Sequence, residues 1–388
     1  MAQCPICEEN TVEPVLELRN IPVYCNALYR TAGEARAAPR GDLTLGFCAA
    51  CGHGVNLSFD PGLMDYKVNY ENSLHYSQTF QRYAKALVSH LARRYRLQGK
   101  TVLEIGSGRG DFLRLFCGLA KCKGIGFDPS LDKIEGNGSA NNPLFLPESF
   151  RKDHLPGPVD LVICRHVLEH VAEPSLFVRE IASAVGEESS AAGYFEVPSL
   201  EWIVERGAVW DLIYEHPQYF SLGSLRRLFE RWGYATERLE REYGGQYLAI
   251  EVIFGEGLRG EARSLPATIQ VSQVRSFAAG AQEVLSRWRS VLRPMLASGT
   301  AVAIWGIGSK AISFLNLLEL GEEPLWLVDQ NPRKVGKYAA GTGLRIHSPE
   351  ELRSFGPEVV LVANSLYLGE IRGSLSDMGL KPQLLSIL

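Results

Sequence analysis

The stretch VLEIGSGRGDFL, residues 102–113, decides the fold of this chain. An apolar run that contains Glu104 leads into three glycines, Gly106, Gly108 and Gly110, and an amphipathic pattern follows them. This order is typical of a strand, a tight turn and the start of a helix, and glycine lets such a turn approach a ligand closely. The stretch therefore predicts an α/β protein with a doubly wound, largely parallel sheet and a ligand at its glycine turn.

The glycine spacing indicates which ligand the turn accepts. A dinucleotide fold favours G-x-G-x-x-G, whereas these three glycines alternate with single residues. Glu104, two positions before Gly106, would repel a pyrophosphate but suits a cation without phosphate, such as S-adenosyl-L-methionine. The next apolar run, GIGFD, ends at Asp128, whose carboxylate can accept hydrogen bonds from ribose hydroxyls. Because dinucleotide folds carry that acid too, Asp128 alone does not discriminate.

Composition and charge exclude several classes of protein. The chain has 388 residues, 46% of them hydrophobic and 22% charged, which predicts two or three core-forming domains. A net charge of −4 gives no electrostatic reason to expect nucleic acid. The opening MAQCPICEEN lacks the apolar core of a signal peptide, and no run is long enough to span a bilayer. We expect a cytoplasmic monomer or weak homodimer that acts on a small molecule and has no membrane partner.

Three regions differ in their sequence pattern. Residues 1–70 are turn-rich and carry paired cysteines, and residues 71–262 alternate helix-like and strand-like patterns, with helical spacing clearest over 80–91. Residues 263–388 begin with one or two helices and then alternate again. Candidate strands of the middle region cover residues 124–128, 160–166 and 193–198. The patterns predict a small N-terminal domain followed by two α/β domains with these limits.

Four of the eight cysteines form two C-x-x-C pairs. CPIC contains Cys4 and Cys7, and CAAC contains Cys48 and Cys51. Two such pairs can supply four thiolates in a tetrahedral shell, which leaves no open position for chemistry. We therefore predict structural Zn²⁺ in a domain that has little core of its own. The alternatives are unrelated thiol pairs or a redox C-x-x-C.

Three stretches, VLEIGSGRGDFL, GIGFDPS and DLVICRHVLEHVAEP, resemble in this order the motifs of class I S-adenosylmethionine-dependent methyltransferases. With the cysteine pairs and the C-terminal VAIWGIGSKAISFLNLL, LVDQNP and GTGLRIHSPEEL, the chain resembles the three-domain sugar C-methyltransferases, which act on nucleotide-linked keto-sugars in antibiotic deoxysugar biosynthesis. The resemblance implies a zinc-binding domain, a class I methyltransferase domain and a C-terminal Rossmann-like domain that helps to hold the nucleotide. The cofactor-binding residues it implies are Glu104, Gly106, Gly108, Gly110, Asp128 and His166.

The resemblance also assigns the stretch DLIYEHPQYFS to the acceptor site. C-methylation next to a ketone requires a base that removes a proton and a group that holds the resulting enolate. In the family, a cluster similar to Tyr-x-Glu-His lies at the sugar, with its histidine as general base. This implies His216 as the base, Glu215 as its orienter or a sugar ligand, and Tyr214 as a hydroxyl donor near the ketone. An imidazole titrates near neutral pH, so it can accept a proton without a large shift of its pKa.

The stretch RHVLEHV offers two further histidines, His166 and His170, which are four residues apart and are expected to share one helix face. Their spacing also suits a zinc pair, but the pattern is not H-E-x-x-H and nothing nearby supplies a third ligand. The methyltransferase resemblance places the stretch at the active-site rim, with His170 facing donor or substrate. His75 and Tyr76 are expected to cover the site from the preceding segment.

Two glycine turns bear on the acceptor. In YGGQYLAIE, Gly245 lets the backbone approach a substrate, but related sequences favour Gly-Gly-Ser-hydrophobic-Arg, and Gln246 and Leu248 depart from that pattern. This departure leaves the acceptor open. In the C-terminal AIWGIGSKA, the turn exposes a helix N-terminus that suits a phosphate, and Lys310 adds charge. A true dinucleotide site in this region is the alternative.

The sequence leaves three functions to compare. The first is C-methylation of a nucleotide-linked keto-deoxysugar with a histidine base. The second is O- or N-methylation of another small metabolite, and the third is a non-catalytic protein that binds S-adenosylmethionine or a nucleotide. The intact Glu104, Gly106, Gly108 and Asp128 favour an enzyme. We therefore predict the first function.

Overall fold

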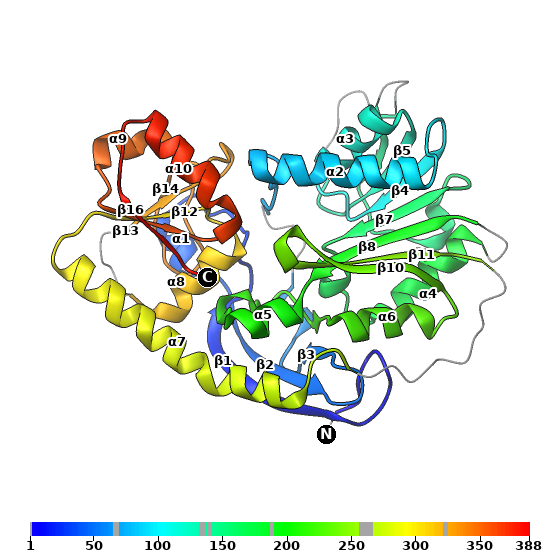
Figure 1. The fold of residues 1–388 in the computed structure, drawn as a ribbon, viewed down its shortest axis with the longest axis horizontal. Helices are drawn as coiled ribbons and strands as arrows, with labels where there is room; N and C mark the ends of the chain where they lie inside the picture. Colours follow the sequence, from blue (N-terminus) through cyan, green and yellow to red (C-terminus); the bar gives the residue numbers. More distant parts are fainter. Residues whose placement is uncertain are drawn as a thin grey trace.

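The computed structural model describes residues 2–64, 70–131, 137–138, 142–186, 190–255, 267–320 and 325–388. These residues form three sheets of four, seven and five strands. In Figure 1 the seven-stranded sheet lies to the right, the five-stranded sheet to the left, and the N-terminal strands lie beneath them. The predicted α/β fold, with a small N-terminal layer and a second α/β layer at the C-terminus, is confirmed.

The N-terminal sheet has the order β1-β2-β3-β9 and is antiparallel throughout. Its core comes from alternating leucines, with Leu16 opposite Leu45 and Leu18 opposite Leu43. The elements of this part are β1 (Val12–Pro22), α1 (Ala32–Arg36), β2 (Arg40–Cys48), β3 (Gly54–Asn56) and the 3₁₀ turn η1 (Pro61–Leu63). The fourth strand, β9 (Gln218–Tyr219), comes from the middle of the chain. The N-terminal sheet therefore fixes the segment that directly follows His216.

The middle sheet has the order β10-β11-β8-β7-β4-β5-β6. Strands β8, β7, β4, β5 and β6 are parallel, and β11 and β10 extend the edge in antiparallel orientation. The strands are β4 (Thr101–Ile105), β5 (Lys123–Phe127), β6 (Leu144–Leu146), β7 (Leu161–Arg165), β8 (Ala192–Pro198), β10 (Ala235–Glu242) and β11 (Tyr247–Ile253). Because β4 pairs with both β5 and β7, the chain reverses its direction of winding here, which is where open α/β sheets bind ligands.

Helices cover both faces of this sheet. They are α2 (Gln78–Arg94), α3 (Asp111–Ala120), α4 (Pro174–Val185), α5 (Leu200–Arg206) and α6 (Leu222–Glu230), with 3₁₀ turns η2 (Lys152–His154), η3 (Leu168–His170), η4 (Val209–Asp211) and η5 (Tyr243–Gly245). Helix α2 forms where helical spacing predicted it, with Ser77 as its N-cap. Phe80, Ala84, Leu87 and Leu91 are buried on one face. Burial of each large apolar side chain contributes about 1.5–3 kcal/mol.

The C-terminal layer begins with one long helix, α7 (Val271–Ala297), where the sequence predicted one or two. It crosses beneath the five-stranded sheet (Figure 1, yellow), whose order is β14-β13-β12-β15-β16, all parallel. The remaining elements are β12 (Val302–Trp305), α8 (Ser309–Leu318), β13 (Leu325–Val328), β14 (Ile346–His347), η6 (Pro349–Glu351), α9 (Leu352–Phe355), β15 (Val359–Val362), η7 (Ser365–Tyr367), α10 (Leu368–Asp377) and β16 (Gln383–Ser386).

The hydrophobic cores join these layers. Cys4, Ile6 and Cys48 belong to the same buried cluster as Phe195 and Phe220 of the middle region. A second cluster combines the N-terminal leucines with α7 and the C-terminal sheet. The domain limit at residue 70 therefore remains a prediction, and the limit at residue 262 lies outside the described residues. Among the described residues, no helix is long and apolar enough to cross a membrane.

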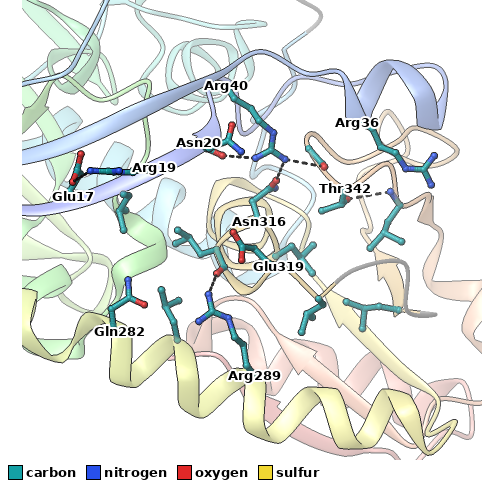
Figure 2. Close-up of a pocket in the computed structure, with 18 residues that line it drawn as sticks. Glu17, Arg19, Asn20, Arg36, Arg40, Gln282, Arg289, Asn316, Glu319 and Thr342 are labelled. Carbon is teal, nitrogen blue, oxygen red and sulfur yellow. Dashed lines mark hydrogen bonds and ion pairs between the residues drawn. The ribbon is translucent and has the colours of Figure 1, made fainter.

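One large cavity lies at the junction between the N-terminal strands and the C-terminal layer, away from the sheet edges. It has a volume of about 840 Å³ and lies between β1, α7 and α8 (Figure 2). Two of its arginines bond to the protein itself: Arg40 donates to Asn20 C=O and Asn316 Oδ1, and Arg289 donates to the carbonyls of Leu317 and Leu318. The cavity thus marks where the N-terminal strands are fastened to the C-terminal layer.

Candidate active site

A cavity of about 960 Å³ lies at the carboxyl ends of β4, β5 and β7. The glycine turn after β4, Asp128 after β5 and His166 after β7 line it. Its walls also include His75, Arg165, His170 and Glu215, which come from three different parts of the chain. The parallel topology thus brings the sequence-predicted donor motif and part of the acceptor motif to one cavity.

The glycine turn needs its glycines for two reasons. Gly106, Gly108 and Gly110 all have positive φ angles, of 74°, 52° and 80°. A Cβ on Gly106 would lie 2.1 Å from Val167 Cγ2, and one on Gly110 would lie 2.3 Å from Phe145 Cζ. A Cβ on Gly108 would meet nothing within 4 Å. Gly108 therefore borders open space on the cavity side, while Gly110 starts helix α3.

Glu104 is the buried acid of the turn. Its side chain is 3% exposed, and Oε2 has no hydrogen-bond partner among the described residues. Burial raises the pKa of Glu104 to about 8, opposed by the nearby charge of Arg165. The hydroxyl of Ser107, in the same turn, also lacks a partner within the described chain. Two orphaned polar groups beside an open turn fit a ligand that carries a positively charged hydrogen-bond donor.

Asp128 is oriented by the backbone around it. Its Oδ2 accepts a hydrogen bond of 2.7 Å from the Gly108 N–H, and its Oδ1 accepts one of 2.8 Å from the Ser130 N–H. The carboxylate lines the cavity, so its remaining lone pairs are available to hydroxyl groups. This geometry agrees with the ribose role predicted from the sequence.

A buried charge network supports the cavity from β8. Glu196 is fully buried and accepts hydrogen bonds from Arg165 Nε at 2.9 Å and from the Tyr194 hydroxyl at 2.8 Å. Tyr83 of α2 donates a further hydrogen bond, and His166 Nε2 lies 3.0 Å from Glu196 Oε1. The sequence analysis did not single out Glu196 or Arg165, because a charged residue inside an apolar strand shows no partner in sequence.

His166 differs from its prediction. It does not share a helix face with His170, because it leaves β7 with a φ of 55° and only the 3₁₀ turn η3 follows. Burial opposes the charged ring, but the carboxylates of Glu169, 3.6 Å from Nδ1, and of Glu196, 3.0 Å from Nε2, raise the pKa of His166 to about 9. The ring is therefore held as a cation in the cavity wall. Its assignment to the cofactor remains a prediction.

His170 and His216 form a pair of rings. Their centroids are 4.7 Å apart at an interplanar angle of 86°. His170 lines the cavity and places Nδ1 3.0 Å from the Glu215 carbonyl oxygen, while His216 lies behind it and is 7% exposed. Burial and the charge of His170 hold the pKa of His216 well below its usual value. Side-chain atoms of both histidines and of buried Glu169 lie within 4.8 Å of one another.

Glu215 is held at the cavity by two partners. Its Oε1 accepts a hydrogen bond of 2.8 Å from the Cys25 N–H, and its Oε2 accepts one of 2.8 Å from the Tyr70 hydroxyl. Burial raises the pKa of Glu215. Tyr70 also lines the cavity and was missed by the sequence analysis, which gave no signal that residue 70 would meet residue 215.

Tyr214 lies away from the cavity. Its hydroxyl oxygen accepts a hydrogen bond of 2.9 Å from the Asp60 N–H, and its ring packs against Gly41, where a Cβ would lie 2.4 Å from it. The side chain is 1% exposed and does not line the cavity. Its predicted role as a hydroxyl donor to the ketone receives no support from this placement.

The four predicted substrate residues are not brought together. His75 lines the cavity, whereas Tyr76, Gly245 and Lys310 do not. Gly245 lies beside Arg241 and Trp202. The Lys310 ammonium forms an ion pair with Asp211 of η4.

Gln246, which departs from the pattern of related sequences, has a partner in the C-terminal layer. Its amide exchanges two hydrogen bonds of 2.9 Å with the Asn364 amide, and both side chains are buried. The Tyr243 hydroxyl donates to the Tyr367 hydroxyl at 2.8 Å beside this pair. The turn at 243–246 therefore fastens the middle region to the C-terminal layer.

Hydrogen bonds within the chain order the second glycine turn, after β12. The Ile307 N–H donates to Asp329 Oδ2 at 2.8 Å, and the Lys334 ammonium donates to the Ile307 carbonyl at 2.8 Å. Lys334 is buried and also lies 3.6 Å from Asp329. A Cβ on Gly308 would meet nothing within 4 Å, as at Gly108, so the dinucleotide site in this region remains an untested alternative.

The four paired cysteines meet in one cluster. Cys4 Sγ lies 3.6 Å from Cys51 Sγ, Cys7 Sγ lies 3.6 Å from Cys48 Sγ, and all four sulfurs lie within 4.8 Å of one another. A tetrahedral shell with Zn–S bonds near 2.3 Å places its sulfurs about 3.8 Å apart. The geometry of the four thiols thus fits one zinc ion.

Comparisons with known proteins agree with this arrangement. A family model described as a methyltransferase domain matches residues 76–239, and one described as a C-methyltransferase C-terminal domain matches residues 261–379. The C-methyltransferase NovU of Streptomyces niveus is 27% identical over 296 residues, which cover 70% of this chain and 68% of that protein.

Solved methyltransferases resemble part of the chain. Magnesium protoporphyrin IX methyltransferase from Synechocystis, bound to SAH, is 19% identical with a TM-score of 0.36, over 45% of this chain and 83% of its own. A SAM-dependent methyltransferase from Aquifex aeolicus is 18% identical with a TM-score of 0.33, over 43% of this chain and 89% of its own.

Proposed function

Because this chain is an S-adenosylmethionine-dependent C-methyltransferase with a methyltransferase domain and a C-methyltransferase C-terminal domain, we propose that it methylates a carbon next to the ketone of a nucleotide-linked keto-deoxysugar. The C-terminal domain match favours carbon over the O- or N-methyl transfer that the sequence left open. The sugar class follows from the motifs that resemble the sugar C-methyltransferases.

The reaction requires a base at the wall of the donor cavity. Bound S-adenosylmethionine supplies an electrophilic methyl group. We assign the neutral imidazole of His216 as the general base, which receives the proton from the carbon next to the ketone by way of the His170 ring, because His170 lines the cavity and His216 packs against it. The electron pair released from the C–H bond forms the enolate, whose carbon then takes the methyl group. The imidazolium formed by proton transfer is compensated by buried Glu169, whose carboxylate lies in the same cluster.

One observation carries this proposal. A pair of imidazoles in edge-to-face contact adjoins the same cavity as the orphaned Glu104 and the open glycine turn. The lowered pKa of His216 keeps that ring neutral at physiological pH, which a base requires. Since protonation removes the base, the acid limb of the kcat/KM profile should lie below pH 6.5.

Two histidine variants test the assignment. His216→Ala should bind S-adenosylmethionine normally but lose methyl transfer by roughly 100-fold or more, together with solvent deuterium exchange at the carbon next to the ketone. Deuterium exchange is measured by mass spectrometry on a nucleotide keto-sugar, with His154→Ala, a half-buried histidine that does not line the cavity, as the control. If His216→Ala keeps exchange while His170→Ala loses it, His170 is the base instead.

We also propose that the four-cysteine cluster holds structural Zn²⁺. The sulfur spacing supports it, and four thiolates leave no coordination position open for catalysis. The ion would tie the first residues of the chain to β2 and the turn after it, because Cys4 and Cys7 precede β1, Cys48 ends β2 and Cys51 lies in the turn that follows. Elemental analysis of the purified protein tests it, with one equivalent of zinc expected.

A further inference from the structure

Two cysteines outside the four-cysteine cluster form a second thiol pair. Cys117 lies in the last turn of α3, and Cys122 directly precedes β5. Their Sγ atoms are 3.6 Å apart. Neither residue lines the active-site cavity, and neither belongs to a group of potential metal ligands among the described residues. The pair is therefore part of neither the methyl-transfer site nor the proposed zinc site.

Both thiols of this pair are within reach of small solutes. Cys117 and Cys122 are half-buried, whereas the other two cysteines outside the four-cysteine cluster, Cys25 and Cys164, are buried. Burial raises the pKa of Cys25 and of Cys164 well above the usual value of a thiol, which keeps both unreactive. Cys117 and Cys122 thus combine access to solvent with a neighbouring thiol.

The two thiols of the pair differ in reactivity. Contact with the Cys117 thiol lowers the pKa of Cys122, while the same contact, together with burial, raises the pKa of Cys117. Lys121 and Lys123 flank Cys122 in the sequence, and positive charge favours a thiolate. Cys117 lies at the C-terminal end of a helix, where the helix dipole disfavours negative charge. Cys122 is therefore the better nucleophile.

The backbone holds the two sulfurs beside each other. Lys121 ends α3 with a φ of 55°, and its N–H donates to the Cys117 carbonyl at 2.9 Å. The Cys117 sulfur packs against Gly124 of β5, where a Cβ would lie 2.6 Å from it. A disulfide bond is about 2.05 Å long, and rotation of the half-buried Cys122 side chain brings its sulfur closer to Cys117.

We propose that Cys117 and Cys122 are a redox-modification site, which forms a reversible disulfide when a peroxide oxidises the protein. The Cys122 thiolate attacks one oxygen of hydrogen peroxide, the O–O bond breaks, and the released hydroxide takes up a proton to become water. The Cys117 thiol then attacks the sulfenic acid on Cys122. An S–S bond forms, the S–O bond breaks, and a second water leaves. The two sulfurs lose two electrons, which the peroxide gains, and a small thiol reverses the bond by exchange.

The disulfide would fasten the end of α3 to the start of β5. Helix α3 begins at Gly110 of the donor turn, and β5 leads to Asp128. The two elements that carry these donor residues would thus be joined at their opposite ends, outside the cavity. The assignment requires no particular methyl acceptor, so it goes beyond the proposed function and can fail independently of it.

Peptide mapping of the full-length, zinc-containing protein tests the assignment. The reduced protein is freed of reductant, treated with hydrogen peroxide, alkylated under denaturing conditions and digested with trypsin. Cleavage after Lys121 separates the two cysteines, so only a disulfide joins residues 115–121 to residues 122–123. We expect this linked pair of peptides after peroxide and its loss after dithiothreitol. Cys25 and Cys164 serve as internal controls and should be recovered as alkylated thiols throughout.

Single variants separate the roles of the two thiols. Cys117→Ser removes the second thiol, so peroxide should leave Cys122 as a sulfenic acid that dimedone traps. Cys122→Ser removes the nucleophile, so dimedone should label Cys117 roughly tenfold less. Under reducing conditions both variants should keep the zinc content of the wild type and nearly its thermal transition, which shows that they fold.

Two results would overturn the assignment. Recovery of Cys117 and Cys122 in separate alkylated peptides after peroxide treatment of the wild type would show that the pair forms no disulfide. Equal dimedone labelling in the two variants would reject Cys122 as the thiol that reacts with peroxide.

Discussion

At the scale of single residues, Glu104 gives the sharpest test of the donor site. The variant Glu104→Gln keeps the side-chain shape but removes the charge that a cationic donor would meet. We expect its dissociation constant for S-adenosylmethionine to rise roughly ten- to a hundredfold at pH 8, as for the loss of a hydrogen bond to a charged group. Calorimetric titration measures this, and an unchanged constant would contradict the assignment of Glu104 to the donor.

The pKa of Glu104 adds a pH dependence to this binding. Burial raises the pKa to about 8 in the free protein, so the carboxyl is largely protonated at pH 6 and must lose its proton to meet a cation. Affinity should therefore rise with pH up to about 8, by at most about tenfold per pH unit, and then level off. Glu104→Gln should lack this rise, while the titration of the ligand's own amino group persists in both proteins.

Residue identities predicted the local structure around Glu104 better than that around residues 214–216. The acid and glycine spacing of residues 104–110 placed Glu104 and the turn correctly, because local sequence determines a strand, a turn and a helix start. Tyr214 and His216 are two residues apart in sequence, yet one packs against Gly41 and the other against His170. Backbone direction in an irregular segment depends on contacts with distant strands, which a single sequence does not reveal.

At the scale of secondary-structure elements, Glu196 holds three elements around the cavity. It lies on β8, accepts hydrogen bonds from Arg165 at the end of β7 and from Tyr83 of α2, and is fully buried. Glu196→Gln leaves the Arg165 guanidinium buried without its counter-charge. We expect the free energy of unfolding to fall by about 3–5 kcal/mol, measured by urea denaturation.

An exposed ion pair provides the matched control for Glu196. Glu205 pairs with Arg241 at 2.8 Å, and its side chain is about half exposed. Glu205→Gln should change the free energy of unfolding by no more than about 1 kcal/mol, since solvent screens the pair. If Glu196→Gln and Glu205→Gln lose the same free energy of unfolding, burial does not determine how strongly the Glu196 network stabilises the protein.

The elements themselves were largely predictable. Helix α2 and the strands at 124–128, 160–166 and 193–198 formed close to their predicted positions, because long periodic segments are the strongest signal in a sequence. The periodicity of apolar residues does not give the order of the strands in the sheet. The strand β9 pairs with β3, more than 150 residues away in sequence, and so joins the N-terminal sheet, which the sequence did not predict in the turn-rich residues 1–70.

At the scale of the whole molecule, the cysteine cluster is built into a shared core. Cys4, Cys48 and Cys51 are buried together with Phe195 and Phe220 of the methyltransferase region. The Arg231 guanidinium donates to the Ile6 carbonyl at 3.2 Å, which adds a polar contact across the same boundary. A module that shares its core unfolds with its neighbour rather than by itself.

Cys4→Ser should therefore release the metal and lower the temperature of the main unfolding transition, rather than add a separate early one. The loss of a structural zinc site removes binding free energy that stabilises the folded state, and the shared core passes that loss to the methyltransferase region. Scanning calorimetry with elemental analysis measures both effects. Cys122→Ser, a half-buried cysteine outside the cluster, should keep the zinc and nearly the wild-type transition. If Cys4→Ser instead melts in two steps, with the upper step unchanged and still stabilised by S-adenosylmethionine, the N-terminal region is an independent unit despite its buried contacts.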